Sequence, residues 1–572
     1  ASLTNRGRMD VTNGGLVDIV NDGGSVVARD AGFAVNFDNT GGTLTLHGRN
    51  TALLGLNFTG GTVAGDGVDG SDSFLGTAGG GDQINFHGPI TFDGTLAGGG
   101  THHVVVEGNS NGTADMMAIN GMNLQFINGQ LIGGSLDTDA GSLISGNNQR
   151  FASLTNRGRM DVTNGGLVDV TNTGFITVNA GVGVSAEFHN SGMVDVIGDL
   201  TVDTMHPSGT TNLGTMRASG GGTLLFNTGN INNSNGIIEA LDGGLVQVAG
   251  TANALNFEAG GDLADGTWRV VDGGGGAAME VVKDGFVLTS IGANAFVELS
   301  GGGSQFTVNG VGVEATLTNN QGHLSIQGGR VFNTAAGLVN DGLLELGGTG
   351  SQLNLAGAYI QNSGQTILNG ATLDSQGGPA EFNAGSLSGS GTILGGAVFG
   401  ANATVDIGSS PGILNFVGDS AFDGLINFEI LNTLVDGAAP NPSTVNTAVN
   451  AAITGFDQIN VTGTATLQDT LTINLTLLDP SSLIFGNFFD IFTADILLVD
   501  LTMIELALPE DFMASIFLDG VRQALRLTYF DSSLPIGNVP EPETLPLLLF
   551  GCVLYHPAPI VTLEGFPNSP GS

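Results

Sequence analysis

Several residue types are scarce in this sequence, and each scarcity excludes a class of structure or partner. Cysteine occurs once, at Cys552, so no disulfide can form within the chain. Basic residues number 13 against 53 acidic ones, which gives a formal net charge of −40. A surface of this sign repels nucleic acids and anionic membranes. No run reaches the roughly 18–20 apolar residues of a spanning helix. We therefore expect no nucleic-acid partner and no membrane-spanning segment.

The residues that carry most enzyme chemistry are also scarce. Lys283 is the single lysine, and Arg269 is the nearest basic residue in the sequence. A lyase acting on acidic sugars needs such a cation to neutralise a carboxylate and take up a proton. A glycoside hydrolase needs two carboxylates roughly 5–10 Å apart, a condition that some pair among the 53 acids always meets. One Trp and three Tyr leave few rings on which a sugar can stack. We predict that the chain is not an enzyme and binds no obligatory cofactor.

Glycine and aliphatic residues dominate what is present. The chain of 572 residues contains 96 Gly, and hydrophobic residues make up 41% of it. That apolar share is too large for a disordered glycine-rich chain and is sufficient to fill a core. Glycine at this density opposes long helices, because each helical site loses about 1 kcal/mol relative to Ala.

One phrase of eighteen letters, ASLTNRGRMDVTNGGLVD, begins at Ala1 and returns at Ala152. Apolar residues alternate within it, as Met160 and Val162 illustrate, and Asn-x-Gly groups separate the alternating runs. A period of two is typical of a strand with one buried face, and Asn and Gly accept the backbone angles of tight corners. The phrase predicts a strand, a corner and a second strand.

Looser versions of the same corner follow at short, regular intervals. Successive corners begin at Asn156, Asn172, Asn190, Asn212 and Asn235, with spacings of 16, 18, 22 and 23 residues, and others follow near residues 319, 340 and 362. A repeat of roughly 20 residues is the size of one turn of a solenoid. Hairpins would instead need matched two-residue turns. The sequence predicts an all-β fold, a right-handed parallel β-helix (β-solenoid) with a C-terminal β-rich cap.

Changes in composition divide the chain into five predicted regions. They are a first solenoid segment with long loops (1–151), a second solenoid segment (152–300), the most regular repeats (301–400), a β-rich C-terminal cap with longer strands (401–535) and a tail (536–572).

Two stretches resemble known families. The run SLSGSGTILGGAVFGANATVDIGSSPGILNF, from Ser386 to Phe416, resembles the end of autotransporter-like passenger β-helices, where glycine-rich strands lead to a terminal β-cap. The segment NVPEPETLPLLLFGCVLY, from Asn538, resembles a PEP-CTERM sorting signal through Val539, Pro540, Glu541 and Pro542. The basic end of that signal is replaced by HPAPIVTLEGFPNSPGS. The second resemblance implies export by a Gram-negative bacterium and association with exopolysaccharide or the cell surface.

Two clusters contain residue types that bind metal ions. Asp66, Asp69 and Asp72 lie in the glycine-rich loop GDGVDGSDS and are the candidate ligands for Ca²⁺, which prefers six to eight oxygen ligands. A solvated acidic loop is the simpler interpretation, because the spacing is not that of an EF-hand. His102 and His103 are adjacent in a predicted strand and would point to opposite faces, so they are not expected to share an ion.

These patterns together predict an exported structural protein of the bacterial cell surface or extracellular matrix. The strand edge at Ala1 has no preceding repeat in this sequence, and we expect it to pair head to tail with a second copy and form filaments. One alternative is an adhesin that binds exopolysaccharide or a surface through loops 60–82 and 436–452. The other is a polysaccharide-active β-helix enzyme.

Overall fold

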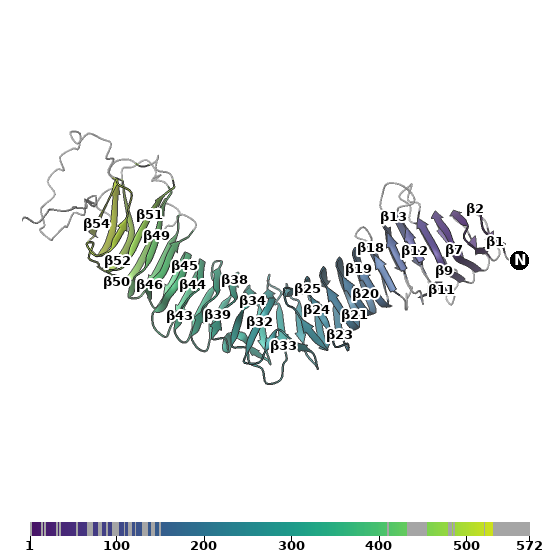
Figure 1. Cartoon of the computed structure of the whole chain (residues 1–572), viewed down its shortest axis with the longest axis horizontal. Coiled ribbons are helices and arrows are strands. Elements are labelled where there is room, and N and C mark those ends of the chain that lie inside the picture. The colour runs from purple at the N-terminus through teal and green to yellow at the C-terminus, as the bar shows by residue number, and fades with distance from the viewer. Residues whose placement is uncertain are drawn as a thin grey trace, which may run out of the picture. The chain divides into compact units, whose positions relative to one another are not determined.

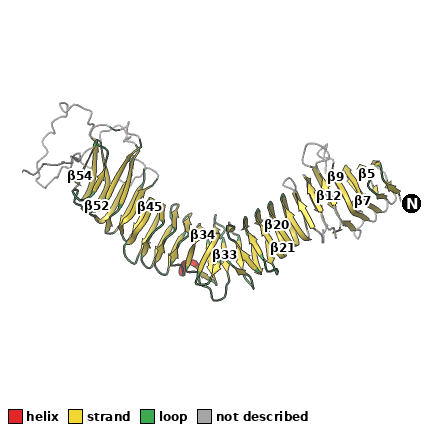
Figure 2. Ribbon diagram, in the orientation of Figure 1, coloured by secondary structure: helices red, strands yellow, loops and turns green. Residues whose placement is uncertain are grey.

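The computed structural model is built almost entirely of β-strands. It describes residues 3–12, 15–16, 19–29, 32–33, 36–47, 49–52, 55–65, 73–77, 83–86, 90–93, 102–107, 109–112, 117–120, 122–127, 135–138, 143–147, 150–408, 411–431, 455–478, 483, 487–519 and 521–529. Within these ranges no α-helix occurs, and η2 (Val313–Ala315) is a single 3₁₀ turn (Figure 2). The chain forms two compact units, Ala1–Leu353 and Asn354–Ser572. The prediction of an all-β chain is confirmed.

The first unit contains short strands in close succession (Figure 1). Up to residue 150 they are β1 (Leu3–Asn5), β2 (Arg8–Thr12), β3 (Gly15–Leu16), β4 (Ile19–Asn21), β5 (Ser25–Arg29), β6 (Gly32–Phe33), β7 (Asn36–His47), β8 (Arg49–Ala52), β9 (Gly55–Gly65), β10 (Ser73–Thr77), β11 (Gln83–Phe86), β12 (Ile90–Asp93), β13 (His102–Glu107), β14 (Asn109–Gly112), β15 (Met117–Asn120), β16 (Met122–Ile127), β17 (Ser135–Thr138) and β18 (Leu143–Asn147). From residue 150 they are β19 (Arg150–Asn156), β20 (Arg159–Asn172), β21 (Phe175–Asn190), β22 (Met193–Val196), β23 (Asp199–Asp203), β24 (Thr210–Asn212), β25 (Thr215–Ser219), β26 (Thr223–Thr228), β27 (Asn230–Asn232), β28 (Ile237–Leu241), β29 (Leu245–Val248), β30 (Asn253–Ala254), β31 (Phe257–Glu258), β32 (Asp262–Val271), β33 (Ala278–Val281), β34 (Ser290–Ser300), β35 (Gln305–Val308), β36 (Val311–Gly312), β37 (Asn319–Asn320), β38 (His323–Gln327), β39 (Val331–Thr334), β40 (Leu338–Asn340) and β41 (Leu343–Gly347), and β42 (Gln352–Leu355) spans residue 353.

Pairing between these strands is mostly parallel and connects segments about one sequence repeat apart. β22 pairs with β25, β25 with β28, and β28 with β32, all in parallel register. β23, β26, β29 and β33 form a second parallel series, and β24, β27 and β30 a third. The chain therefore returns to the same side after each repeat, and the predicted parallel pairing is confirmed. Two short antiparallel pairs, β31 with β32 and β35 with β36, interrupt the pattern.

The interior is filled by the alternate residues of each strand. Met216, Ile238 and Trp268 are paired in register and are fully buried, whereas their neighbours in sequence are half-buried, except for the buried Glu239. Trp268 packs edge-on against Phe257, with ring centroids 5.0 Å apart. The period of two in the sequence thus corresponds to an apolar column that runs from one repeat to the next.

Buried asparagines mark one corner of consecutive repeats. The side chain of each donates a hydrogen bond to the side-chain oxygen of the next, with distances of 2.7–2.8 Å. We call this set the asparagine column: Asn156, Asn172, Asn190, Asn212 and Asn233. In the first copy of the repeated phrase, Asn5 donates likewise to Asn21 over 2.9 Å. The column corrects one sequence assignment, because Asn233 and not Asn235 is the buried residue, and Asn235 is a turn residue with φ of 62°.

The glycine of the corner permits close stacking of the repeats. A Cβ atom built on Gly192 would lie 2.0 Å from the carbonyl oxygen of Gly174, and one on Gly214 would lie 2.1 Å from that of Gly192. No side chain fits at such a distance. The Asn-x-Gly pattern therefore has two roles. The buried asparagine forms hydrogen bonds with the asparagines of neighbouring repeats, and the glycine lets the backbones of neighbouring repeats lie in contact.

The second unit continues with longer strands. They are β43 (Tyr359–Gln361), β44 (Gln365–Ser375), β45 (Ala380–Leu394), β46 (Ala397–Ile407), β47 (Ile413–Val417), β48 (Ser420–Phe422), β49 (Leu425–Ile430), β50 (Gln458–Leu467), β51 (Thr472–Leu477), β52 (Phe488–Leu498), β53 (Glu505–Ala507), β54 (Phe512–Asp519) and β55 (Arg522–Tyr529). Most pairs are parallel, as between β45 and β46, and stacked rings such as Phe382 on Phe399, 4.8 Å apart, fill the interior.

The last strands of this unit pair differently. β52 pairs with β55 and β55 with β54, both antiparallel, and we call these three strands the antiparallel sheet. Arg526 in the central strand forms a two-pronged ion pair with Asp490, at 2.7 and 2.9 Å, and both residues are buried. Its guanidinium lies between the rings of Phe488 and Phe517, 3.9 and 3.7 Å from their centroids. A single buried charge is thus matched by one carboxylate and two ring faces.

Candidate functional site

Three loops of the first unit meet around Lys283. Its Nζ donates hydrogen bonds to the carbonyl oxygens of Ala254 and Phe257, at 2.9 and 2.5 Å. Asn309 accepts a bond from the Lys283 backbone N–H and donates to the carbonyls of Lys283 and Phe286. The loop before β31, the loop after β33 and the turn between β35 and β36 are therefore joined by hydrogen bonds rather than by the parallel pairing used elsewhere.

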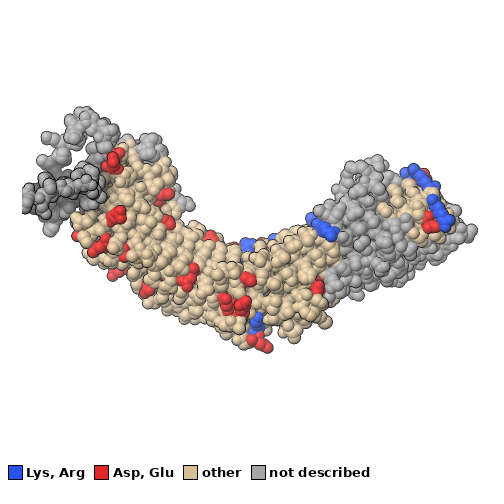
Figure 3. Space-filling model, viewed as in Figure 1, with Lys and Arg blue, Asp and Glu red and all other residues tan. Residues whose placement is uncertain are grey.

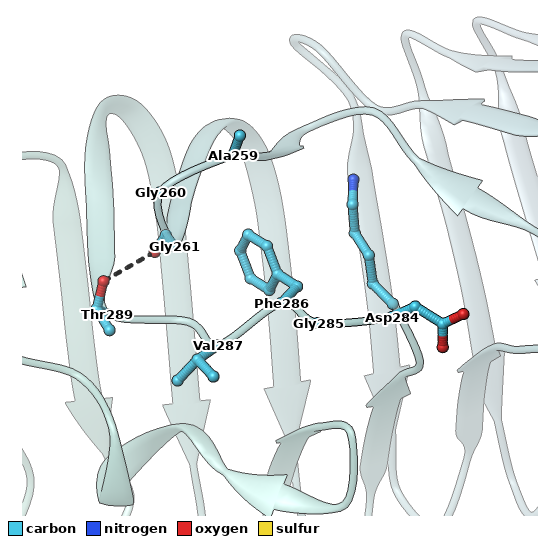
Figure 4. A pocket seen from close by; sticks show the side chains of 9 residues that line it. Ala259, Gly260, Gly261, Asp284, Gly285, Phe286, Val287 and Thr289 are labelled. Atoms are coloured by element: carbon cyan, nitrogen blue, oxygen red, sulfur yellow. Dashed lines mark hydrogen bonds between the residues drawn. The ribbon is translucent and has the colours of Figure 1, made fainter.

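An open pocket of about 580 Å³ lies among these loops. Its lining residues are Ala259, Gly260, Gly261, Lys283, Asp284, Gly285, Phe286, Val287 and Thr289. Figure 4 shows the Phe286 ring beneath Ala259 and Gly260, with the Asp284 carboxylate directed away from it. Val287 is 52% exposed, and Thr289 Oγ1 donates to the Gly261 carbonyl over 3.3 Å. Glycine forms much of the wall, so the shape of the pocket is set by backbone.

The amine of Lys283 is engaged by the protein itself. Partial burial lowers the pKa of Lys283, and the nearby carboxylate of Glu258 opposes that effect. Two carbonyl acceptors hold the charged form in place between two loops. The Lys283 amine therefore joins two loops and is not directed across the pocket toward a substrate.

Arg269 lies in a different part of the unit, within a row of alternating charges. We call this row the ion column: Asp195, Arg217, Glu239, Arg269 and Glu298, each directly paired with the next on neighbouring strands. Arg217 forms two hydrogen bonds with Asp195, at 3.0 and 2.9 Å. Arg269 lies 2.9 Å from Glu239 and 2.6 Å from Glu298. Lys283 and Arg269, the two basic residues considered for lyase chemistry, are thus each engaged by other groups of the protein, Lys283 by two carbonyl oxygens and Arg269 by two carboxylates.

Burial and ion pairing compete within the ion column. Burial raises the pKa of Asp195, but hydrogen bonds from Arg217 and Ser219 outweigh burial and lower that pKa overall. Burial lowers the pKa of Arg269, whereas the hydrogen bond that Arg269 donates to Glu298 and the charges of Glu298 and Glu239 raise it on balance. Both residues therefore remain charged at neutral pH. The column contributes attraction between successive repeats on their outer face.

A third cluster joins two histidines to one carboxylate. His189 Nε2 lies 3.2 Å from Glu187 Oε2, and His206 contacts the other carboxylate oxygen. The hydrogen bond with His189 is the largest effect and lowers the pKa of Glu187, burial comes next and raises it, and the charges of His206 and His189 and a hydrogen bond with Ser208 bring it lower still. In the part of the chain that the structure describes, no group of three or more His, Cys, Asp or Glu residues is arranged to hold a metal ion.

The sequence-predicted site residues fall into two groups. Asp66, Asp69 and Asp72 lie outside the described residues, as do Val539, Pro540, Glu541 and Pro542 and the loop at 436–452. His102 and His103 lie in β13, where they are paired with Met122 and Asn123 of β16. The Ca²⁺ site and the sorting signal therefore remain predictions.

The structure also contains groupings that the sequence analysis missed. The ion column joins residues 22 to 30 positions apart, and no local pattern marks them as neighbours. The unusual loop composition near Lys283 was a usable signal, because ALNFEAGGD and VVKDGFVLTS interrupt the Asn-x-Gly repeat.

Comparisons with known proteins provide no family assignment. No protein-family model matches the chain, and no curated protein matches it. Among the described residues no helix has the length and apolar character needed to cross a membrane.

Proposed function

We propose that the chain is a right-handed parallel β-solenoid with a C-terminal β-rich cap, and that it serves as an exported structural protein of the bacterial surface or extracellular matrix. The observation that carries this proposal is the parallel pairing of successive repeats, with apolar and asparagine columns inside. Each repeat supports the next, so stability grows along the axis without disulfides or cofactors. This suits a spacer or scaffold outside the cell.

The chemistry of the described residues supports a non-catalytic role. Lys283 bridges two carbonyl groups and Arg269 bridges two carboxylates. The net charge of −40 favours solvation and disfavours anionic partners. The resemblance of Val539–Pro542 to a PEP-CTERM signal supplies the expectation of export, and self-association would convert single molecules into matrix.

Three measurements test this proposal. Electron microscopy of purified protein is expected to reveal elongated particles that join into filaments. Protease treatment of intact producing cells is expected to remove the protein, and mass spectrometry of the mature ends is expected to find processing near Pro542. A protein found only inside intact cells would contradict the proposed location, and particles that never associate would contradict self-assembly.

One observation favours an adhesin as the second candidate. The pocket beside Lys283 has exposed apolar atoms of Val287 at its rim and a wall of backbone. A glycan array would compare the natural chain with Val287→Asp and, as a control, Val398→Asp, which is also exposed. Loss of glycan binding only in the first variant would support an adhesin. Absence of binding in the natural chain would exclude it for the glycans tested.

A further inference from the structure

The repeated phrase presents the same pair of arginines twice. Arg6-Gly7-Arg8 and Arg157-Gly158-Arg159 each follow a buried asparagine, and we call them the RGR turns. Asn5 Oδ1 accepts a bond from the Gly7 N–H, and Asn156 Nδ2 donates to the Gly158 carbonyl. The buried amide therefore holds each turn from inside while its arginines extend outward.

The arginine side chains are placed for contact with solvent or a partner. Those of Arg6 and Arg8 are 77% and 71% exposed, and Arg157 and Arg159 are exposed as well. Arg6 lies 2.7 Å from Asp22, and Arg8 lies 3.4 Å from Asp10. Ion pairs this exposed contribute little to stability. The folded chain thus gains little from the ion pairs of Arg6 and Arg8, and the guanidinium of Arg159 lies 5.7 Å from the centroid of the Phe175 ring. Of the 13 basic residues, 7 fall within the first 160 positions.

The second unit, which contains the antiparallel sheet, has the opposite charge balance. Residues 354–572 hold 21 of the 53 acidic residues and 2 of the 13 basic ones. Glu510 is exposed two positions before β54, and Glu505 is exposed in β53, the preceding strand, which pairs with β51. Of the two arginines, one is buried and the other pairs with Asp495. In Figure 3, acidic side chains are scattered over the described surface of this unit and basic ones are not seen there.

The same sheet has an apolar edge strand. Among the described strands, β54 pairs only with β55. Ile516 and Leu518 in this strand are 40% and 64% exposed, and Val521 beyond it is 83% exposed. Natural sheets usually protect such an edge with lysine, proline or a covering segment. The described part of β54 has an apolar edge, and we call the two exposed acids of the segment that leads into it, Glu505 and Glu510, the acidic border.

We propose that the RGR turns of one copy dock on the acidic border of β54 in a second copy. This inference rests on the proposed self-association and names the two surfaces involved. Charge complementarity determines which surfaces meet. Two copies of a chain with net charge −40 repel each other except where the arginines of one contact the carboxylates of the other. Guanidinium groups bind carboxylates in a two-pronged geometry, and the apolar side chains of β54 add contact area that salt does not screen.

Sedimentation velocity of the full chain tests the proposal by charge exchange, at about 0.15 M salt, where the Debye length is about 8 Å. Arg6→Glu/Arg8→Glu and Arg157→Glu/Arg159→Glu each remove one RGR turn, and combining them removes both. Glu505→Lys/Glu510→Lys inverts the acidic border. We expect the four-arginine variant and the border variant each to associate at least about tenfold more weakly than the natural chain, and a mixture of the two variants to regain association. Asp199→Lys/Glu381→Lys makes the same charge change as the border variant at two exposed positions elsewhere and is expected to leave the association of the natural chain unchanged.

The outcomes separate this inference from the proposed function. Circular dichroism first establishes that each variant is folded. If the natural chain associates and folded variants associate equally well, the docking surfaces are wrong while self-assembly stands. If the natural chain stays monomeric under all conditions, self-assembly itself fails. If the arginine variants lose only binding to an anionic polysaccharide, the RGR turns are a glycan surface and the proposal is overturned.

Discussion

At the scale of single residues, stability depends on polar groups placed inside an apolar chain. Asn190 is 1% exposed and its amide takes part in hydrogen bonds with Asn172, Asn212 and the Thr215 carbonyl. Burying an amide that makes all its hydrogen bonds costs little free energy. Burying one that lacks them is unfavourable, because its lost hydrogen bonds to water are not replaced. The asparagine column is therefore strong only as long as it is complete.

Asn190→Ala is expected to lower the free energy of unfolding by about 3 kcal/mol, because Asn212 Oδ1 and the Thr215 carbonyl lose a donor and Asn172 Nδ2 loses one of its acceptors inside the chain. Urea unfolding followed by circular dichroism measures the change. Asn179→Ala, an exposed asparagine of the same strand, is the control and should stay within about 0.5 kcal/mol of the natural chain. Equal effects of the two substitutions would contradict the role of the column.

His323 gives the first unit a dependence on pH. Its ring stacks on Phe296 with centroids 4.0 Å apart, and its Nε2 lies 3.3 Å from Glu345. Burial lowers the pKa of His323 below its ordinary value of 6.5, although the charges of Glu345 and Glu298 oppose this. Between 6.5 and the lowered pKa the unfolded chain binds a proton that the folded chain does not. Stability is therefore lost as the pH falls through this window.

His323→Gln is expected to remove that loss. Urea midpoints measured at several pH values from about 7.5 to 4.5, a range that brackets the ordinary histidine pKa, give the slope of stability against pH. A slope that is unchanged in the His323 variant would show that another group titrates.

At the scale of strands, neighbouring repeats are coupled on their outer face by the ion column. Arg269 joins β28 to β34 from the strand between them, and Glu239 is buried to 6% exposure. Removing the cation leaves Glu298 without its ion-pair partner and Glu239 with only Arg217 beside it. Such a loss costs more than an exposed ion pair is worth, because the carboxylates are partly removed from water.

Arg269→Met is expected to lower the free energy of unfolding by about 1–3 kcal/mol, less than for a fully buried pair because the arginine is partly exposed. Arg269→Met combined with Glu239→Gln and Glu298→Gln should recover most of that loss, since no unpaired charge remains. Thermal and urea unfolding compare the two variants. A triple variant no more stable than the single one would assign the cost to packing rather than charge.

At the scale of the whole molecule, repetition implies tolerance to loss of a complete repeat. Asn172 and Asn190 hold equivalent places, and β20, β21 and β22 pair in the same phase. Each repeat contacts mainly its neighbours, so removing one leaves the others able to pair.

Deletion of residues 173–190 is expected to leave a cooperatively unfolding β-rich chain with a modest decrease in stability. Deletion of residues 173–181, half as long, should prevent pairing across the gap because it changes the phase of the corners. Far-ultraviolet circular dichroism and urea unfolding distinguish the two. Equal tolerance of both deletions would show that the repeats do not depend on register.

The amino-acid sequence by itself determined that the chain is all-β and pairs in parallel at intervals of roughly 20 residues, since alternation and Asn-Gly corners are local patterns. The tertiary structure alone decided that Asn233 and not Asn235 is buried, that Asp195 to Glu298 form one column, and that β54 presents an edge. The physical reason is register: a shift of one residue between strands turns every side chain to the other face, and only the paired backbones settle which residues meet.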